Sequence, residues 1–182
     1  MIIAEQKRKE NIAEYLLYMY QVEDMIRANK LDLDSIEETL ISKFEVSYEV
    51  QREMREWYKA LIDMMRDEKK EQVGHLNILG TTAEQMEEMH TQILKQGIDT
   101  SYKETFGRAK IHIEALKMRS GHGIESDIQV ALNGLYGLLI LRLKKTPITE
   151  ETLKAFETIR ELIAELSARY MEGAVGETKD LI

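Results

Sequence analysis

The sequence predicts an all-α protein, a compact single-domain bundle of about seven helices. Apolar residues recur at helical spacing along the whole chain, and no segment of any length alternates as a strand would. The 182 residues include one proline and 10 glycines, so few positions force a break in a helix. A chain of this length buries about 70% of its unfolded surface, which is enough for one core. No repeat of about 30 to 45 residues indicates a helical solenoid.

The expected helices follow from apolar spacing and from signals at their ends. The capping-box pattern Ser35-x-x-Glu38 opens the second helix, and Gly97 is placed to end the fourth. The break at Thr146-Pro147-Ile148-Thr149 separates the last two helices. The first four expected helices are 5–29, 34–44, 47 to about 74, and 75–95, with a bend at Gly74. The last three are 99 to about 120, with a stop at 121–123, then 125–145, and 150 to about 170.

Two finer expectations concern the middle of the chain. The helix at 75–95 contains Gly80-Thr81-Thr82, where we expect an interruption. The helix at 125–145 is apolar on nearly every side, which is typical of a central helix wrapped by others. Its apolar run, 128–143, is shorter than the roughly 20 residues that span a bilayer. We expect one domain at 1–172 and a polar C-terminal tail at 173–182.

Composition narrows the classes of function. The formal net charge is −8, and the few dense basic runs disfavour nucleic acid and anionic membrane as partners. The chain has no cysteine, which excludes thiolate catalysis and Cys-ligated metal centres. The N-terminus lacks the apolar segment of a secretory signal, so we expect a cytoplasmic protein. No glycine-rich phosphate loop or nucleophile motif is present, and we expect no cofactor.

Four segments resemble an uncharacterised family of small all-helical bacterial proteins, a domain of unknown function. They are KRKENIAEYLLYMYQVEDMIRA (7–28), VQREMREWYKALIDMM (50–65), GHL (74–76) and ALNGLYGLLILRLKK (131–145). Tyr20 stands where these relatives often carry tryptophan. The resemblance implies a soluble helical protein of bacterial origin, and it transfers no catalytic residue.

One pair of residues has the spacing of a metal site. Glu87-x-x-His90 places a carboxylate and an imidazole on one helix face, as in di-iron bundles. Such sites need a second copy, and the residues three positions before the other histidines are Gln72, Ala109 and Arg119. We therefore interpret Glu87 and His90 as a surface or boundary pair and expect no stoichiometric metal.

Polar and small residues interrupt the apolar helix at 125–145. Gly134 and Gly137 lie three residues apart, on a face where a neighbouring backbone or a ligand can come close. Asn133 and Tyr136 share the same spacing and are candidates for a hydrogen-bond network in the core. Tight helix packing and a ligand site both fit this pattern.

A second candidate set joins the first and third expected helices. On the first helix it contains Tyr15, Tyr18, Tyr20, Glu14, Glu23 and Asp24, and we expect these residues to pack near Trp57 and Tyr58 of the third. Tyrosines with a carboxylate can bind a small cationic or polar ligand, and they can equally form an aromatic core with helix ion pairs.

These observations favour a non-enzymatic helical interaction or scaffold protein over an enzyme. Its partner would be another protein, or a second copy, bound through an exposed apolar helix face. The alternative is a small-ligand- or metal-binding bundle. Its site would lie between the expected first, third and sixth helices, where Asn133, Tyr136, Trp57 or Tyr58 and a carboxylate converge.

Overall fold

The computed structural model describes residues 2–120 and 126–179, with side chains as far as Gly173. All regular structure in these ranges is helical and no strand occurs in them, which confirms the predicted all-α fold. In chain order the elements are α1 (Ile2–Glu10), α2 (Ile12–Ala28), α3 (Leu33–Thr39), the 3₁₀ helix η1 (Ile41–Lys43), α4 (Tyr48–Asp67), α5 (Asn77–Gln96), α6 (Thr100–Ser120), α7 (Asp127–Leu143) and α8 (Glu150–Lys179).

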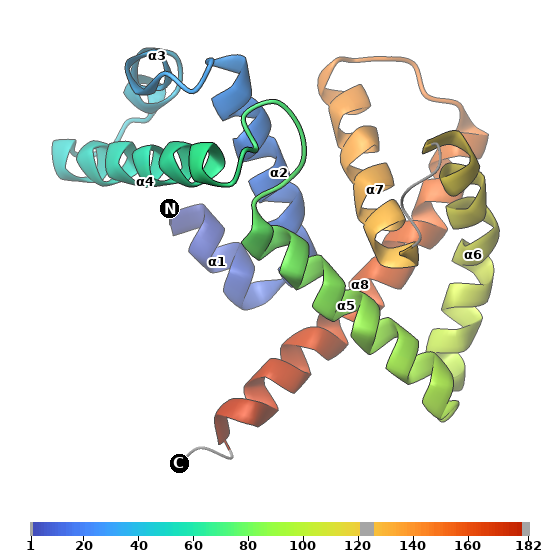
Figure 1. Cartoon of the computed structure of the whole chain (residues 1–182). Helices are drawn as coiled ribbons and strands as arrows, with labels where there is room; N and C mark the ends of the chain where they lie inside the picture. Colours follow the sequence, from blue (N-terminus) through green and yellow to red (C-terminus); the bar gives the residue numbers. More distant parts are fainter. Residues whose placement is uncertain (1, 121–125, 180–182) are drawn as a thin grey trace.

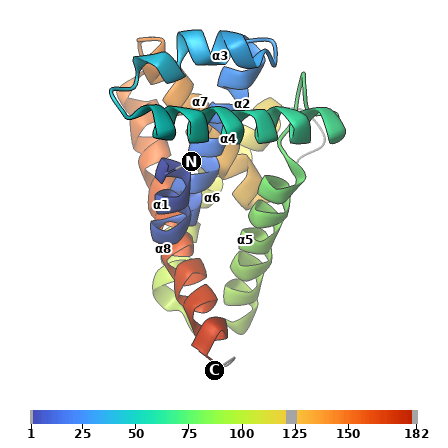
Figure 2. The same cartoon turned by 90° about the vertical axis from the view of Figure 1, so that its left-hand side faces the viewer.

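Helices α7 and α8 form the centre of the bundle, and each packs against α2, α5 and α6 (Figure 1). Helix α1 folds back on α2, while α3 and η1 pack on α4. Figure 2 shows α4 lying across one end of the molecule, and α5 and α8 converging toward the opposite end, where the C-terminus lies. Helix α2 therefore lies between the α3–α4 end of the molecule and the central helices.

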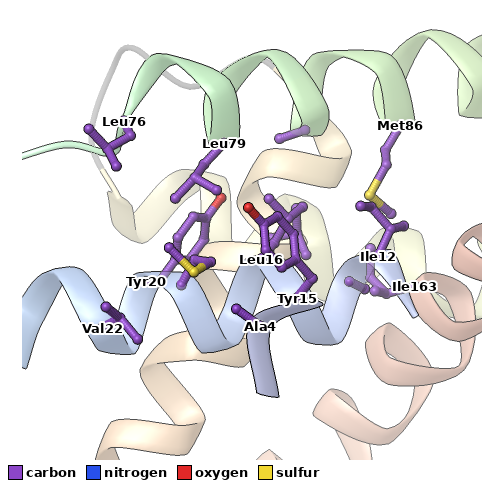
Figure 3. Close-up of a cluster of buried hydrophobic side chains, with 14 of the residues drawn as sticks. Ala4, Ile12, Tyr15, Leu16, Tyr20, Val22, Leu76, Leu79, Met86 and Ile163 are labelled. Carbon is purple, nitrogen blue, oxygen red and sulfur yellow. The ribbon is translucent and has the colours of Figure 1, made fainter. Parts of the chain in front are cut away.

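Apolar side chains from α2, α5, α7 and α8 make up most of the core. Figure 3 shows Leu79 and Met86 of α5 directed toward Tyr20 and Ile12 of α2. Full burial of one such side chain contributes roughly 1.5–3 kcal/mol, so packing between helices supplies most of the stability.

Several helix ends match the expected signals. Ser47 and Thr149 precede α4 and α8, and their hydroxyls accept hydrogen bonds from the backbone N–H groups of Val50 (3.4 Å) and Thr152 (3.2 Å). Gly97 ends α5 with a φ of 73°, in the left-handed region that favours glycine.

The single helix expected at 5–29 is divided at Asn11. The Asn11 side chain accepts the backbone N–H of Glu14 at 3.0 Å and the hydroxyl of Ser167 on α8 at 2.8 Å. Because this tertiary partner lies 156 residues away, apolar spacing alone gave no sign of the break. The division raises the number of α-helices in the described ranges from the expected seven to eight.

The cap of α3, which is the second helix expected from the sequence, also differs from the prediction. Asp32, not Ser35, caps α3, accepting the backbone N–H groups of Asp34 and Ser35. The Ser35 hydroxyl donates instead to Asn29 at 2.8 Å.

Helix α5 runs through 80–82, so the expected interruption there is wrong. The expected stop at 121–123 lies outside the described residues, as does Glu125. Helix α8 continues to Lys179, so the part of the expected tail at 173–179 is helical.

The two glycines of α7 have different environments. A Cβ atom at Gly134 would lie 2.8 Å from Leu116 Cδ1 and 3.1 Å from Phe156 Cε1, so α6 and α8 pack closely against this position. A Cβ atom at Gly137 would meet no atom within 4 Å, because this residue faces open space. Close packing therefore explains Gly134 and does not explain Gly137.

We predict opposite effects of substitutions at these two positions. Gly134→Leu overpacks the core and lowers the free energy of unfolding by roughly 1–3 kcal/mol. Gly137→Ala removes a flexible residue from an open helix position and is neutral or stabilising by up to about 1 kcal/mol. Urea unfolding followed by circular dichroism measures both, and equal losses at the two positions would contradict the packing difference.

Candidate functional site

A buried carboxylate lies where α2 meets the connection between α4 and α5. The side chain of Glu23 is 0% exposed. Its Oε1 accepts the backbone N–H of Leu76 at 2.8 Å, and its Oε2 lies 2.6 Å from Nδ1 of His75. Both oxygens are engaged, which offsets the cost of removing a charged group from water.

His75 is held by a second contact, with Tyr20. The two rings stack with centroids 3.6 Å apart and planes 17° apart. Burial raises the pKa of the Tyr20 hydroxyl, so Tyr20 stays a neutral phenol.

Tyr136 of α7 also contacts Tyr20, and it contacts Asp24 of α2. Its ring lies edge-on to Tyr20, with centroids 5.8 Å apart. Its hydroxyl donates to Oδ2 of Asp24 at 2.6 Å. Burial raises the pKa of Tyr136, and the hydrogen bond to Asp24 and its charge raise it further. Tyr136 therefore stays protonated at neutral pH and donates its hydrogen bond to Asp24.

Asn133 joins this group through Gln129, one turn earlier on α7. The Gln129 side-chain amide donates to Oδ1 of Asn133 at 2.9 Å and to the Tyr20 hydroxyl at 3.4 Å. Asn133 and Tyr136 thus belong to one network centred on Tyr20, without the direct bond between them that their spacing allows. We refer to the whole set as the Tyr20 cluster; its members are Tyr20, Glu23, Asp24, His75, Gln129, Asn133 and Tyr136.

Arg27 extends the contact between α2 and the α4–α5 connection. Its guanidinium donates to Oδ1 of Asp24 at 2.9 Å, to the backbone oxygen of Lys70 at 3.1 Å and to that of Gly74. Gly74 has a φ of 83°, a left-handed conformation that glycine adopts readily. One turn of α2 therefore binds the connection through both backbone and side chains.

The other three predicted residues make their ring contacts elsewhere. Trp57 and Tyr58 form an edge-to-face pair on α4, with centroids 5.0 Å apart. Burial, with a smaller effect from Tyr18, raises the pKa of Tyr58 to about 12. Tyr15 is buried on α2, with the Arg8 guanidinium 5.9 Å from its ring centroid. The structure brings Glu23, Asn133 and Tyr136 together in one network, and Trp57, Tyr58 and Tyr15 make none of its hydrogen bonds.

Glu87 and His90 both lie on α5, and their side chains contact α7 and α6. One oxygen of Glu87 accepts the hydroxyl of Ser126 at 2.7 Å and the backbone N–H of Ile128 at 2.9 Å, and so caps α7. His90 is buried, so the expected surface or boundary position is wrong for this residue, and its Nδ1 lies in hydrogen-bond contact with the Tyr102 hydroxyl of α6 at 2.7 Å.

Burial lowers the pKa of His90, although the carboxylates of Glu87 and Asp127 oppose this effect. A neutral imidazole forms no ion pair with Asp127, whose oxygen lies 3.9 Å from Nε2. Within residues 2–120 and 126–173, no three His, Cys, Asp or Glu side chains are grouped so that they could hold a metal ion. The absence of stoichiometric metal stays a prediction.

An apolar groove lies between α2, α7 and α8, with a volume of about 440 Å³. Most of its lining is aliphatic or aromatic, and charged groups stand among the remaining residues. The apolar lining residues are Ala13, Leu17, Leu135, Leu138, Leu139, Leu153, Phe156, Ile163 and Ala164, and the polar ones are Asn11, Glu14, Arg142, Glu157 and Arg160.

Sequence reasoning missed this groove, and it also missed His75 and Gln129 as members of the cluster. It placed Tyr20 and Asp24 in a candidate set with Trp57 and Tyr58, whereas the structure joins them to Tyr136 of α7. The near-continuous apolar pattern of α7 indicated a fully wrapped helix, which hid the face that α2 and α8 leave open. His75 lies 52 residues from Glu23, and no local pattern links the two.

The fold and these features define a class of protein: an all-α bundle with a hydrogen-bonded polar cluster on one side of α7 and an open apolar groove on the other. The chain belongs to the family described as Domain of unknown function (DUF4924), which matches residues 1–177. No curated protein and no solved structure matches this chain. No helix in the described ranges is both long enough and apolar enough to cross a membrane.

We predict that Glu23→Ala lowers the free energy of unfolding by about 2–3 kcal/mol, because it leaves the buried N–H of Leu76 without an acceptor. The matched control is Glu14→Ala on the same helix, which removes an exposed ion pair with Lys7 and costs at most about 1 kcal/mol. Chemical denaturation measures both losses. Equal losses in the two variants would show that Glu23 has no special structural role.

Proposed function

We propose that this chain is a non-enzymatic interaction protein that binds a helix of a partner protein in the α2–α7–α8 groove. The observation that carries the proposal is the groove itself, about 440 Å³ in volume and lined by nine apolar side chains from three helices. Apolar grooves between helices are a common way of binding the apolar face of an amphipathic helix.

The hydrogen bonds within the Tyr20 cluster favour a binding function over a catalytic one. Both oxygens of Glu23 are engaged, and the hydroxyl of Tyr136 is bonded to Asp24. A catalytic acid or base needs a proton-transfer atom within reach of a substrate. These groups instead satisfy one another, which suits a structural role.

The exposure of the groove supports a protein partner. Leu153 lines it and is 37% exposed. Leu141 and Leu143, which follow Leu139 on α7, are 39% and 58% exposed. Exposed apolar side chains at and near a groove are typical of protein interaction sites.

The second candidate is an apolar small molecule with a carboxylate. The presence of Arg142 at the groove favours it, since a few charged groups orient ligands in otherwise apolar sites. The groove volume also falls within the range of small-molecule sites, roughly 300–1,000 Å³. The proposal places either activity in the bacterial cytoplasm, on the basis of the absent cysteines and the resemblance of the four segments. It includes neither nucleic acid nor membrane as a partner, in keeping with the net charge of −8.

Photo-crosslinking in cells of the source organism tests the proposal. A benzoylphenylalanine replaces Leu153 in the groove, and the control carries it at Ile111, which is 70% exposed on α6. We expect a protein partner to crosslink through position 153 and not through position 111. Leu139→Gln in the same chain should lower the yield, because it places a polar group in the groove without adding charge. Equal crosslinking at both positions, or none at position 153, would contradict the proposal.

A further inference from the structure

Resting on the proposed function, we infer that the helix bound in the groove carries carboxylates at the end that lies beside Arg142. The inference concerns the chemistry of the partner. It follows from the distribution of charge around the groove, which differs from that of the chain as a whole.

Three cations lie at the C-terminal end of α7. Arg142 lines the groove, and Lys144 and Lys145 lie two and three residues after it. All three are exposed, and none has a carboxylate within ion-pair distance in the part of the chain that the structure describes. The negative end of the α7 dipole is equivalent to roughly half a unit charge, so it neutralises only part of this charge.

The carboxylates of the groove are already paired. Glu14 lies 2.6 Å from the Lys7 ammonium, and Glu157 lies 2.9 Å from the Arg160 guanidinium. The lining itself is balanced, with Arg142 and Arg160 against Glu14 and Glu157. Beside its Arg142 end the exposed cations Lys144, Lys145 and Lys154 outnumber the carboxylates Glu150 and Glu151, so this end has a surplus of positive charge, although the whole chain has a net charge of −8. A partner with acidic groups at this end gains favourable contacts, and a basic partner meets like charges.

The dimensions of the groove suit a short helix. On α8 the lining runs from Leu153 to Ala164, which at 1.5 Å per residue is roughly 17 Å. Three turns of a partner helix cover this length, with apolar residues at spacings of three and four.

An anionic membrane surface shares part of this chemistry, because Leu141 and Leu143 are exposed beside the same cations. The groove favours a helix, however, since it is a concave site between three helices, and a flat lipid surface does not fill such a site. We therefore assign the site to an acidic amphipathic helix and make membrane binding an outcome of the test.

The experiment uses a displayed library of 16-residue amphipathic helices with randomised charged positions, selected on the full-length protein. We expect the enriched peptides to carry acidic residues at one end. Leu153→Gln and Arg142→Glu should each weaken their binding about tenfold or more. The control Ile111→Gln, on an exposed face of α6, should leave it unchanged. Raising the salt concentration from 50 to 500 mM should also weaken binding.

The remaining outcomes separate the two claims. Enriched peptides that depend on Leu153 but show no preference for acidic residues would overturn the inference and leave the proposed function intact. Peptides that ignore Leu153→Gln would overturn the proposed function. A separate arm uses vesicles of equal parts phosphatidylglycerol and phosphatidylcholine. Binding to these vesicles that Arg142→Glu abolishes, without any acidic peptide enriched, would overturn the inference in favour of a lipid surface.

Discussion

The buried carboxylate of Glu23 is the constraint on which the arrangement of the helices depends. A charged group with no exposure is stable only when hydrogen bonds replace the water it has lost, and Glu23 obtains these bonds from Leu76 and His75. Both partners lie just before α5, so the requirement fixes where α5 begins relative to α2. Arg27 adds bonds to the backbone oxygens of Lys70 and Gly74. The connection between α4 and α5 is therefore held by α2 at several points along its length.

Helix α7 contributes one face to the Tyr20 cluster and another face to the groove of the proposed function. One face carries Gln129, Asn133 and Tyr136, which complete the Tyr20 cluster. The other carries Leu138 and Leu139, which line the groove. Residues three or four apart share a helix face, so one helix can serve both roles without conflict. The polar cluster orients α7 against α2, and this orientation leaves the groove open between α2, α7 and α8.

Sequence pattern was sufficient wherever the determining contact is local. The helices, the caps at Ser47 and Thr149 and the end of α5 at Gly97 all follow from residues within one turn of the feature. It was insufficient where the partner is distant. The break at Asn11 depends on Ser167, and the open surroundings of Gly137 depend on which face of α7 its neighbours leave uncovered. The same distinction between local and distant contacts applies to the candidate site. The spacing within α7 indicated a network that includes Asn133 and Tyr136, whereas its centre at Tyr20 and its link to His75 exist only through tertiary contacts.

The central claim is that the Tyr20 cluster is a structural junction built around the buried Glu23 and that binding takes place elsewhere. Amide hydrogen exchange at Leu76, followed by nuclear magnetic resonance, tests it most directly, because this N–H is the donor to Glu23. A junction held by the buried bond between Glu23 and Leu76 opens only in large unfolding events. The account predicts that the Leu76 amide is protected to the same degree as core amides of α2 such as that of Leu16. Exchange at Leu76 as fast as at the exposed residue Val73 would contradict the account, since it would show a connection that opens freely over the cluster.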